Sequence, residues 1–98
     1  DHDHDDFGSF VVELAEVREP ETLAKRISET AEAEDVLRIK GFVAVEGKAM
    51  RLQVQAVGPR VTHYFDRPWG EGEVRASRLV VIGEKGIDRE KIAALLAA

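Results

Sequence analysis

The stretch VLRIKGFVAVEGKAMRLQVQAVGPRVTHYFD, residues 36–66, decides the fold. It contains three segments in which apolar and polar residues alternate, and glycine-containing turns at residues 46–48 and 58–60 separate them. Alternation of this kind gives each strand one apolar and one polar face. The three segments therefore predict neighbouring strands of an antiparallel sheet with one buried face.

The flanking sequence predicts two more strands and two helices. Residues 7–14 and 77–82 have strand-like patterns, and the apolar run in the second indicates a central strand covered on both sides or partly so. A helix is expected from Pro20 to near Glu34, and another after the N-cap residue Asp88. The order β-α-β-β-β-β-α predicts an α+β two-layer sandwich: a mostly antiparallel sheet of four to five strands with two helices on one face.

One position interrupts the pattern of the second strand. Gly41 breaks the alternation, and the residues that follow it are apolar without exception up to Val45. A glycine inside a strand often marks a β-bulge or a local twist. We therefore expect a bulge or twist at Gly41.

Composition restricts the classes of function. The 98 residues fit one domain, and the absence of cysteine excludes disulfides and thiolate metal sites and fits a cytoplasmic protein. A net charge of −5 argues against broad nucleic-acid binding. No apolar stretch approaches the roughly 20 residues that a membrane helix needs. The expected partners therefore include neither nucleic acid nor a membrane.

Motifs for catalysis are missing from these 98 residues. The sequence contains no GxxxxGK[ST] phosphate loop and no GxGxxG after a strand. With three histidines and no cysteine, it suggests no Ser/His/Asp or Cys/His set. We therefore expect this chain not to be an enzyme by itself.

The first six residues, DHDHDD, are the strongest candidate for metal binding. His2 and His4 alternate with aspartates, and imidazole with carboxylate suits Zn²⁺, Co²⁺ or Ni²⁺. The alternatives are a solvated acidic linker or a remnant of an expression tag. His63 lies in a strand beside aromatic residues, and we expect it to be packed or hydrogen-bonded and not to bind metal.

The polar face of the central strands has two interpretations. It is either an ordinary solvated sheet face or a surface that docks on another domain or subunit. Trp69 is likewise either a core residue that closes one end of the sheet or an interface anchor. RNA binding is the weakest alternative, because we expect no exposed aromatic residue between the basic ones. The candidate docking residues are Arg38, Lys40, Arg51, Gln53, Gln55 and Trp69.

Four strings together resemble the C-terminal domain of CobW-type P-loop GTPases, a family of metal-handling proteins. They are VLRIKGF (36–42), MRLQVQAVG (50–58), YFDRPW (64–69) and SRLVVIG (77–83). None is a catalytic motif, so the resemblance depends on their combination, and it covers nearly the whole chain. It implies that residues 1–6 are the end of an acidic, His-containing interdomain linker and that residues 7–98 are the C-terminal domain.

The resemblance implies a protein longer than this chain, which also begins without methionine. An N-terminal GTPase domain would bind GTP and Mg²⁺ and carry a Cys-x-Cys-Cys metal motif. His2 and His4 would assist in binding Co²⁺ or Zn²⁺. The whole protein would couple GTP hydrolysis to cobalt delivery for cobalamin biosynthesis.

The implied role of this domain is regulation or partner docking without catalysis. Its partners would be the GTPase domain of the same chain and a metal-receiving protein such as a cobalt-insertion enzyme. The competing hypothesis is a stand-alone α+β domain that binds proteins or a small ligand and has no role in metal handling.

Overall fold

Five strands form one antiparallel sheet in the order β1-β5-β2-β3-β4. The computed structural model describes residues 7–98. Its elements are β1 (Phe7–Leu14), α2 (Pro20–Ala33), β2 (Val36–Ala44), β3 (Met50–Val57), β4 (Arg60–Pro68), β5 (Ser77–Glu84) and α3 (Arg89–Ala97). The predicted order of elements and the α+β fold class are confirmed.

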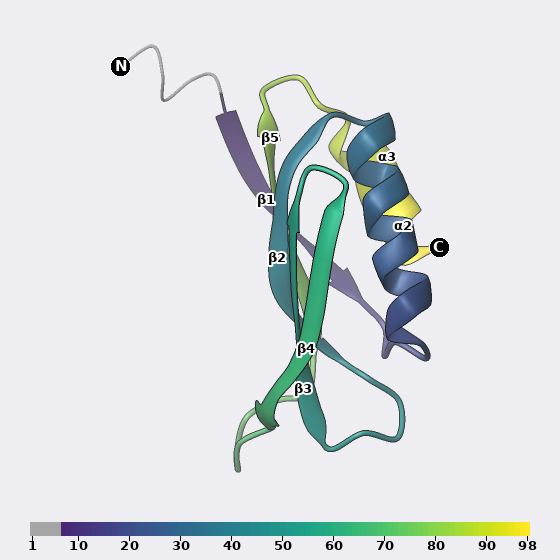
Figure 1. The fold of residues 1–98 in the computed structure, drawn as a ribbon. Helices are drawn as coiled ribbons and strands as arrows, with labels where there is room; N and C mark the ends of the chain where they lie inside the picture. Colours follow the sequence, from purple (N-terminus) through teal and green to yellow (C-terminus); the bar gives the residue numbers. More distant parts are fainter. Residues whose placement is uncertain (1–6) are drawn as a thin grey trace.

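The two helices pack on the same face of the sheet (Figure 1). β5 pairs with both β1 and β2, so these two outer partners run parallel, and α2 makes the crossover between them. Alternate side chains of the strands meet the helices and form a single core. Its fully buried members include Leu23, Ile27, Ile39, Leu52, Leu79, Val81, Ile92 and Leu96.

Local sequence explains where the helices begin. Pro20 occupies the first turn of α2, where its missing N–H costs no hydrogen bond, and Glu21 lies near the positive end of the helix dipole. In α3, the Asp88 side chain accepts a hydrogen bond of 3.1 Å from the backbone N–H of Lys91. This is the N-cap that the sequence predicts.

The bulge predicted at Gly41 is wrong. Pairing between β2 and both neighbours runs through Gly41 without a shift, and the β2–β5 register slips instead between Val36 and Arg38. The presence of glycine at position 41 has a different explanation: a Cβ there would lie 2.0 Å from the carbonyl oxygen of Arg78. The glycine is needed because β2 and β5 approach too closely for a side chain.

Candidate docking surface

The sheet surface opposite the helices, which we call the open face, has no helix over it in residues 7–98 (Figure 1). Its outward side chains include Val11 and Glu13 on β1, Arg78, Val80 and Ile82 on β5, Arg38, Lys40 and Phe42 on β2, Arg51, Gln53, Gln55 and Val57 on β3, and Thr62 and Tyr64 on β4. Five of the six residues predicted for docking therefore share one face. The sixth, Trp69, follows β4 at one end of the sheet.

Exposed apolar side chains gather on this face. Val11, Phe42, Val57 and Tyr64 are all at least 36% exposed, and each points away from the helices. Isolated exposed apolar residues are normal, but several on one uncovered face are typical of a contact surface.

The aromatic residues on the open face correct one expectation. Alternation along the strands predicts no exposed aromatic residue between the basic ones, but Phe42 lies between Lys40 and Arg51 and is 36% exposed. Tyr64, 53% exposed, pairs with Gln53 on the neighbouring strand. Alternation within one strand does not reveal these two residues. Phe42 follows Gly41, where the alternation of its strand is interrupted, and Tyr64 comes from the neighbouring strand β4. With these aromatic residues present, it is the net charge of −5 that disfavours binding to nucleic acid.

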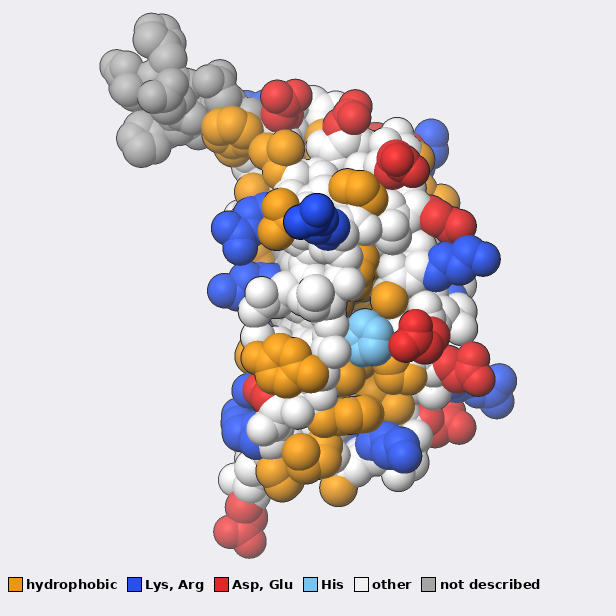
Figure 2. Space-filling view, in the orientation of Figure 1, with side chains coloured by type: hydrophobic (Ala, Val, Ile, Leu, Met, Phe, Trp, Pro, Cys, Tyr) orange, Lys and Arg blue, Asp and Glu red, His pale blue; other side chains and the backbone are white. Residues whose placement is uncertain are grey.

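Charge is distributed unevenly between the two sides. Arg38 and Lys40 are exposed and form no ion pair with another residue in the described range. In Figure 2 most acidic side chains in view lie over the helices, where they alternate with basic ones, whereas the side chains along the left edge, away from the helices, are mainly basic and apolar. Arg60, which pairs with Val57 at the end of β4, is likewise exposed and has no ion pair among the described residues. The open face therefore offers three unpaired cations, Arg38, Lys40 and Arg60, beside apolar groups.

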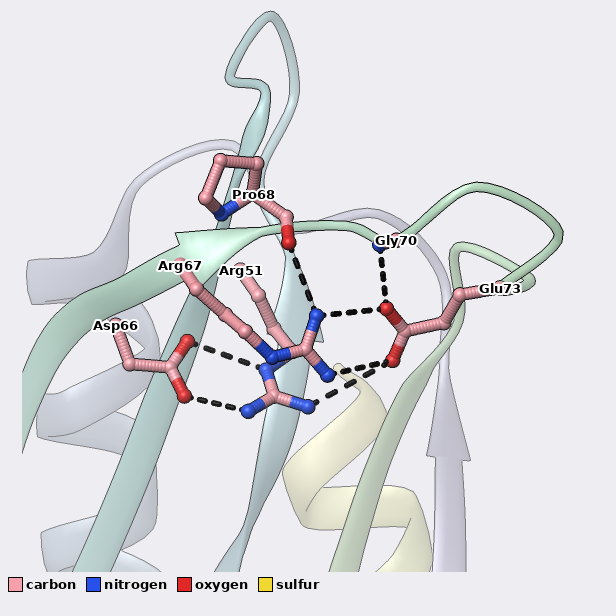
Figure 3. Close-up of polar contacts among 6 residues, drawn as sticks. All are labelled: Arg51, Asp66, Arg67, Pro68, Gly70 and Glu73. Carbon is pink, nitrogen blue, oxygen red and sulfur yellow. Dashed lines mark hydrogen bonds and ion pairs between the residues drawn. The ribbon is translucent and has the colours of Figure 1, made fainter.

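Arg51, in contrast, is bound within the domain (Figure 3). Its guanidinium donates to both carboxylate oxygens of Asp66, at 3.1 and 2.5 Å, and lies 3.7 Å from Glu73. Its Cζ also stacks 3.5 Å from the centroid of the Phe42 ring. The side chain is only 13% exposed, so Arg51 organises the surface and presents no free charge to a partner.

Glu73 is the second acid of this network (Figure 3). It accepts two hydrogen bonds from Arg67, at 2.9 and 3.1 Å, and one of 2.6 Å from the backbone N–H of Gly70. These bonds, first those from Arg67 and then that from Gly70, lower the pKa of Glu73 to about 2. The hydrogen bond from Arg51 lowers the pKa of Asp66. Together the network fastens residues 69–76 to the end of the sheet.

Trp69 is neither a fully buried core residue nor a fully exposed side chain. It is half-buried, 5.9 Å from the Arg75 guanidinium, and helps to line a hollow of about 460 Å³ at the edge of the open face. Its indole N–H is buried and has no acceptor among the described residues. A buried donor without an acceptor costs about 1–3 kcal/mol, so this packing is not optimal for the domain alone. Its role as an interface anchor stays a prediction.

No cluster of three or more metal-binding side chains occurs within residues 7–98. His63 has one acidic neighbour: its Nε2 lies 3.7 Å from Glu21 Oε2. A pair of this kind falls short of the three or four ligands that zinc takes from a protein. His2 and His4 lie outside the described residues, so their predicted metal role is a proposal. Within the same range, no helix has the length and apolarity to span a membrane.

Comparison with known proteins identifies the family. Residues 7–98 match the family described as cobalamin synthesis protein cobW C-terminal domain. This chain belongs to that family. The predicted domain type is thereby confirmed.

Two curated relatives carry the name "Zinc chaperone CobW". The protein from Sinorhizobium sp. is 49% identical over 98 residues, which are 100% of this chain and 28% of that protein. The protein from Pseudomonas aeruginosa is 53% identical over 85 residues, 87% of this chain and 22% of that protein. The chain thus spans about a quarter of the length of these relatives.

Solved structures agree with the fold of this CobW C-terminal domain. A Zn(II)-bound triple mutant of the YjiA GTPase superposes with a TM-score of 0.73 at 31% identity, over 95% of this chain and 30% of that one. The Zn(II)-bound YjiA GTPase from E. coli gives a TM-score of 0.71 at 33% identity, over 95% of this chain and 29% of that one.

Sequence reasoning missed the partners that hold the network together. The strand pattern gives Asp66 no role beyond the end of a strand, and nothing in the sequence distinguishes Glu73. The sequence places Glu73 in RPWGEGEV, between glycines and an arginine, but that composition signals a loop and not a particular ion pair. Val74, the most exposed large apolar residue among those described, was also missed.

Proposed function

We propose that this chain is the non-catalytic C-terminal docking domain of a GTPase metallochaperone. Its open face would bind the GTPase domain of the same protein and transmit the nucleotide state of that domain. Family membership and the names of the relatives support the first part. The observation that carries the second is the open face itself, where Arg38 and Lys40 have no acidic partner beside exposed apolar side chains.

The cargo in this proposal is a divalent metal ion bound mainly outside residues 7–98. Zn²⁺ is the first candidate, because both curated relatives are named as zinc chaperones. Co²⁺ is the second, because the family description refers to cobalamin synthesis. A metal-receiving protein, such as a cobalt-insertion enzyme in the second case, would take the ion after GTP hydrolysis.

A charge reversal on the open face tests the docking role. In the full-length protein, a protease site inserted directly before Phe7 allows the two domains to be separated and their affinity measured. Arg38→Glu/Lys40→Glu is expected to weaken that affinity about ten-fold or more, because complementary charges become like charges, and to change the GTP hydrolysis rate. Arg18→Glu/Lys25→Glu makes the same charge change outside the open face and should alter neither.

Unchanged affinity and an unchanged GTPase rate in the open-face variant would contradict the docking role. The fold itself should survive in both variants, because all four positions are exposed. Circular dichroism of each variant checks this directly.

His2 and His4 are proposed as accessory ligands to the metal. Calorimetric titration of Zn²⁺ and of Co²⁺ into the full-length protein, and into its His2→Ala/His4→Ala variant, tests this. The variant is expected to lose affinity by about ten- to a hundred-fold, the usual effect of groups that support a metal site. His63→Ala is the matched control and should bind as the parent does. Equal affinities in parent and double variant would dispose of the proposal.

A further inference from the structure

Val74 is an apolar loop residue that is both highly exposed and held in place by its neighbours. Its exposed fraction is 78%, the largest of any large apolar side chain in the described residues. Most exposed loop residues can move, which lets an apolar side chain fold back on the surface. Val74 cannot easily do so, because the residues on both sides of it are fastened.

The fastening on one side is Glu73, held by Arg67 and by the backbone N–H of Gly70. On the other side Arg75 donates to Glu16 Oε2 at 2.7 Å. It also donates to the carbonyl oxygens of Lys48 at 2.8 Å and Val45 at 3.2 Å. The 69–76 loop is thus bound to three separate parts of the domain.

A hollow of about 460 Å³ lies directly beside Val74. Its apolar lining is Phe42, Trp69, Val74 and Ala76. The charged residues around it are already paired: Arg51 with Asp66 and Glu73, and Arg78 with Glu13 at 3.1 Å. The surface available to a partner here is therefore apolar: the Val74 side chain projects from it, and the hollow beside Val74 has an apolar lining.

We propose that the 69–76 loop is a preformed recognition element that inserts Val74 into an apolar groove of the GTPase domain and receives an apolar side chain of that domain in the adjacent hollow. A loop fixed before binding loses little conformational entropy on binding, which favours affinity. This inference rests on the proposed function, since it adopts the same partner.

Two observations favour the GTPase domain as the occupant. The hollow is continuous with the open face, because Phe42 and Arg78 belong to both. The relatives extend well beyond the matched domain, which accounts for only 22–30% of their lengths. A second protein or another copy of the chain is an alternative outcome of the test.

Photo-crosslinking in the full-length protein identifies the occupant. The photoreactive amino acid benzoylphenylalanine replaces Val74, and a mixture of ¹⁵N-labelled and unlabelled protein is irradiated and digested for mass spectrometry. The expected product is a crosslink to a GTPase-domain peptide of the same isotopic composition. Placed at Glu29, which is exposed on α2, the same amino acid should give no such product. Crosslinks of mixed isotopic composition only, or none to the GTPase domain, would overturn the inference.

A substitution separates this inference from the proposed function. Val74→Asp should lower the affinity between the separated domains about ten-fold or more, because it puts a charge into an apolar contact. Ala94→Asp, an exposed change on α3, is the control and should have no effect. If Arg38→Glu/Lys40→Glu weakens docking and Val74→Asp does not, the loop inference fails while the proposed function stands. If neither weakens docking, both fail.

Discussion

The two faces of the sheet differ in the burial of their apolar side chains. On the helix side Ile39, Leu52 and Leu79 are at most 1% exposed and belong to the same core as residues of α2 and α3. On the open face Val11, Phe42 and Val57 remain exposed between charged and amide groups. The first face is complete within this domain, whereas the second has the composition of a surface that another protein domain covers.

Adjacent residues of β5 provide the sharpest test of this difference. Leu79→Ala should lower the free energy of unfolding by about 2–5 kcal/mol, because it leaves a cavity in a fully buried core. Val80→Ala, on the open face of the same strand, should cost about 1 kcal/mol or less. Urea unfolding of the two variants at equal m-values measures both. Similar decreases in the free energy of unfolding for the two variants would mean that the two faces contribute equally to stability.

Gly41→Ala should be the next largest effect. A Cβ at this position would lie 2.0 Å from the Arg78 carbonyl oxygen, so β2 and β5 must separate to admit it. We expect a loss of about 1–3 kcal/mol or more in the free energy of unfolding, the usual range for overpacking. Gly47→Ala, at a turn glycine with no atom within 4 Å but with a positive φ of 77°, measures backbone strain alone. A smaller loss at position 41 than at position 47 would contradict the steric argument.

Periodicity predicted the helix-covered face because burial in a sheet depends on alternation, which is local. Met50, Leu52, Val54 and Ala56 alternate along one strand, and the last three are buried in the core. The pairing of strands is not local. The apolar run of residues 77–82 predicted an inner strand, which β5 is, but the pattern does not indicate that its neighbours are β1 and β2. This particular pairing is what forbids a side chain at Gly41.

The candidate site was predictable to the extent that its members alternate within a strand. Arg38, Lys40, Gln53 and Gln55 were found on one face in this way. The state of Arg51 was not predictable, because its partner Glu73 comes from a loop 22 residues later along the chain. Sequence spacing carries no signal for such a contact.

Acid should loosen the 69–76 loop before it disturbs the helix side. Because the pKa of Glu73 is lowered from 4.5 to about 2 in the folded protein, its carboxylate stabilises the fold fully above about pH 4.5. That contribution falls as the pH drops toward 2. We expect the fluorescence of Trp69, the one tryptophan of the chain, to change over this interval.

Glu73→Gln removes the titrating group and should reduce that acid-dependent fluorescence change. Glu71→Gln, in the same loop, is the matched control and should leave it intact. An identical acid transition in all three proteins would show that other carboxylates govern the loop.

The smallest expected effect concerns the contact between the layers at His63 and Glu21, which is an ion pair only when the histidine is protonated. His63 lies on the helix side of β4 and approaches Glu21 of α2 at 3.7 Å, but the Glu21 side chain is 90% exposed. Water and salt screen such a pair, so a double-mutant cycle with Glu21→Gln and His63→Gln should give a coupling below about 0.5 kcal/mol. The coupling should fall further at high ionic strength. A coupling above about 1 kcal/mol would mean that charge, as well as the buried Leu23 and Ile27, holds α2 against the sheet.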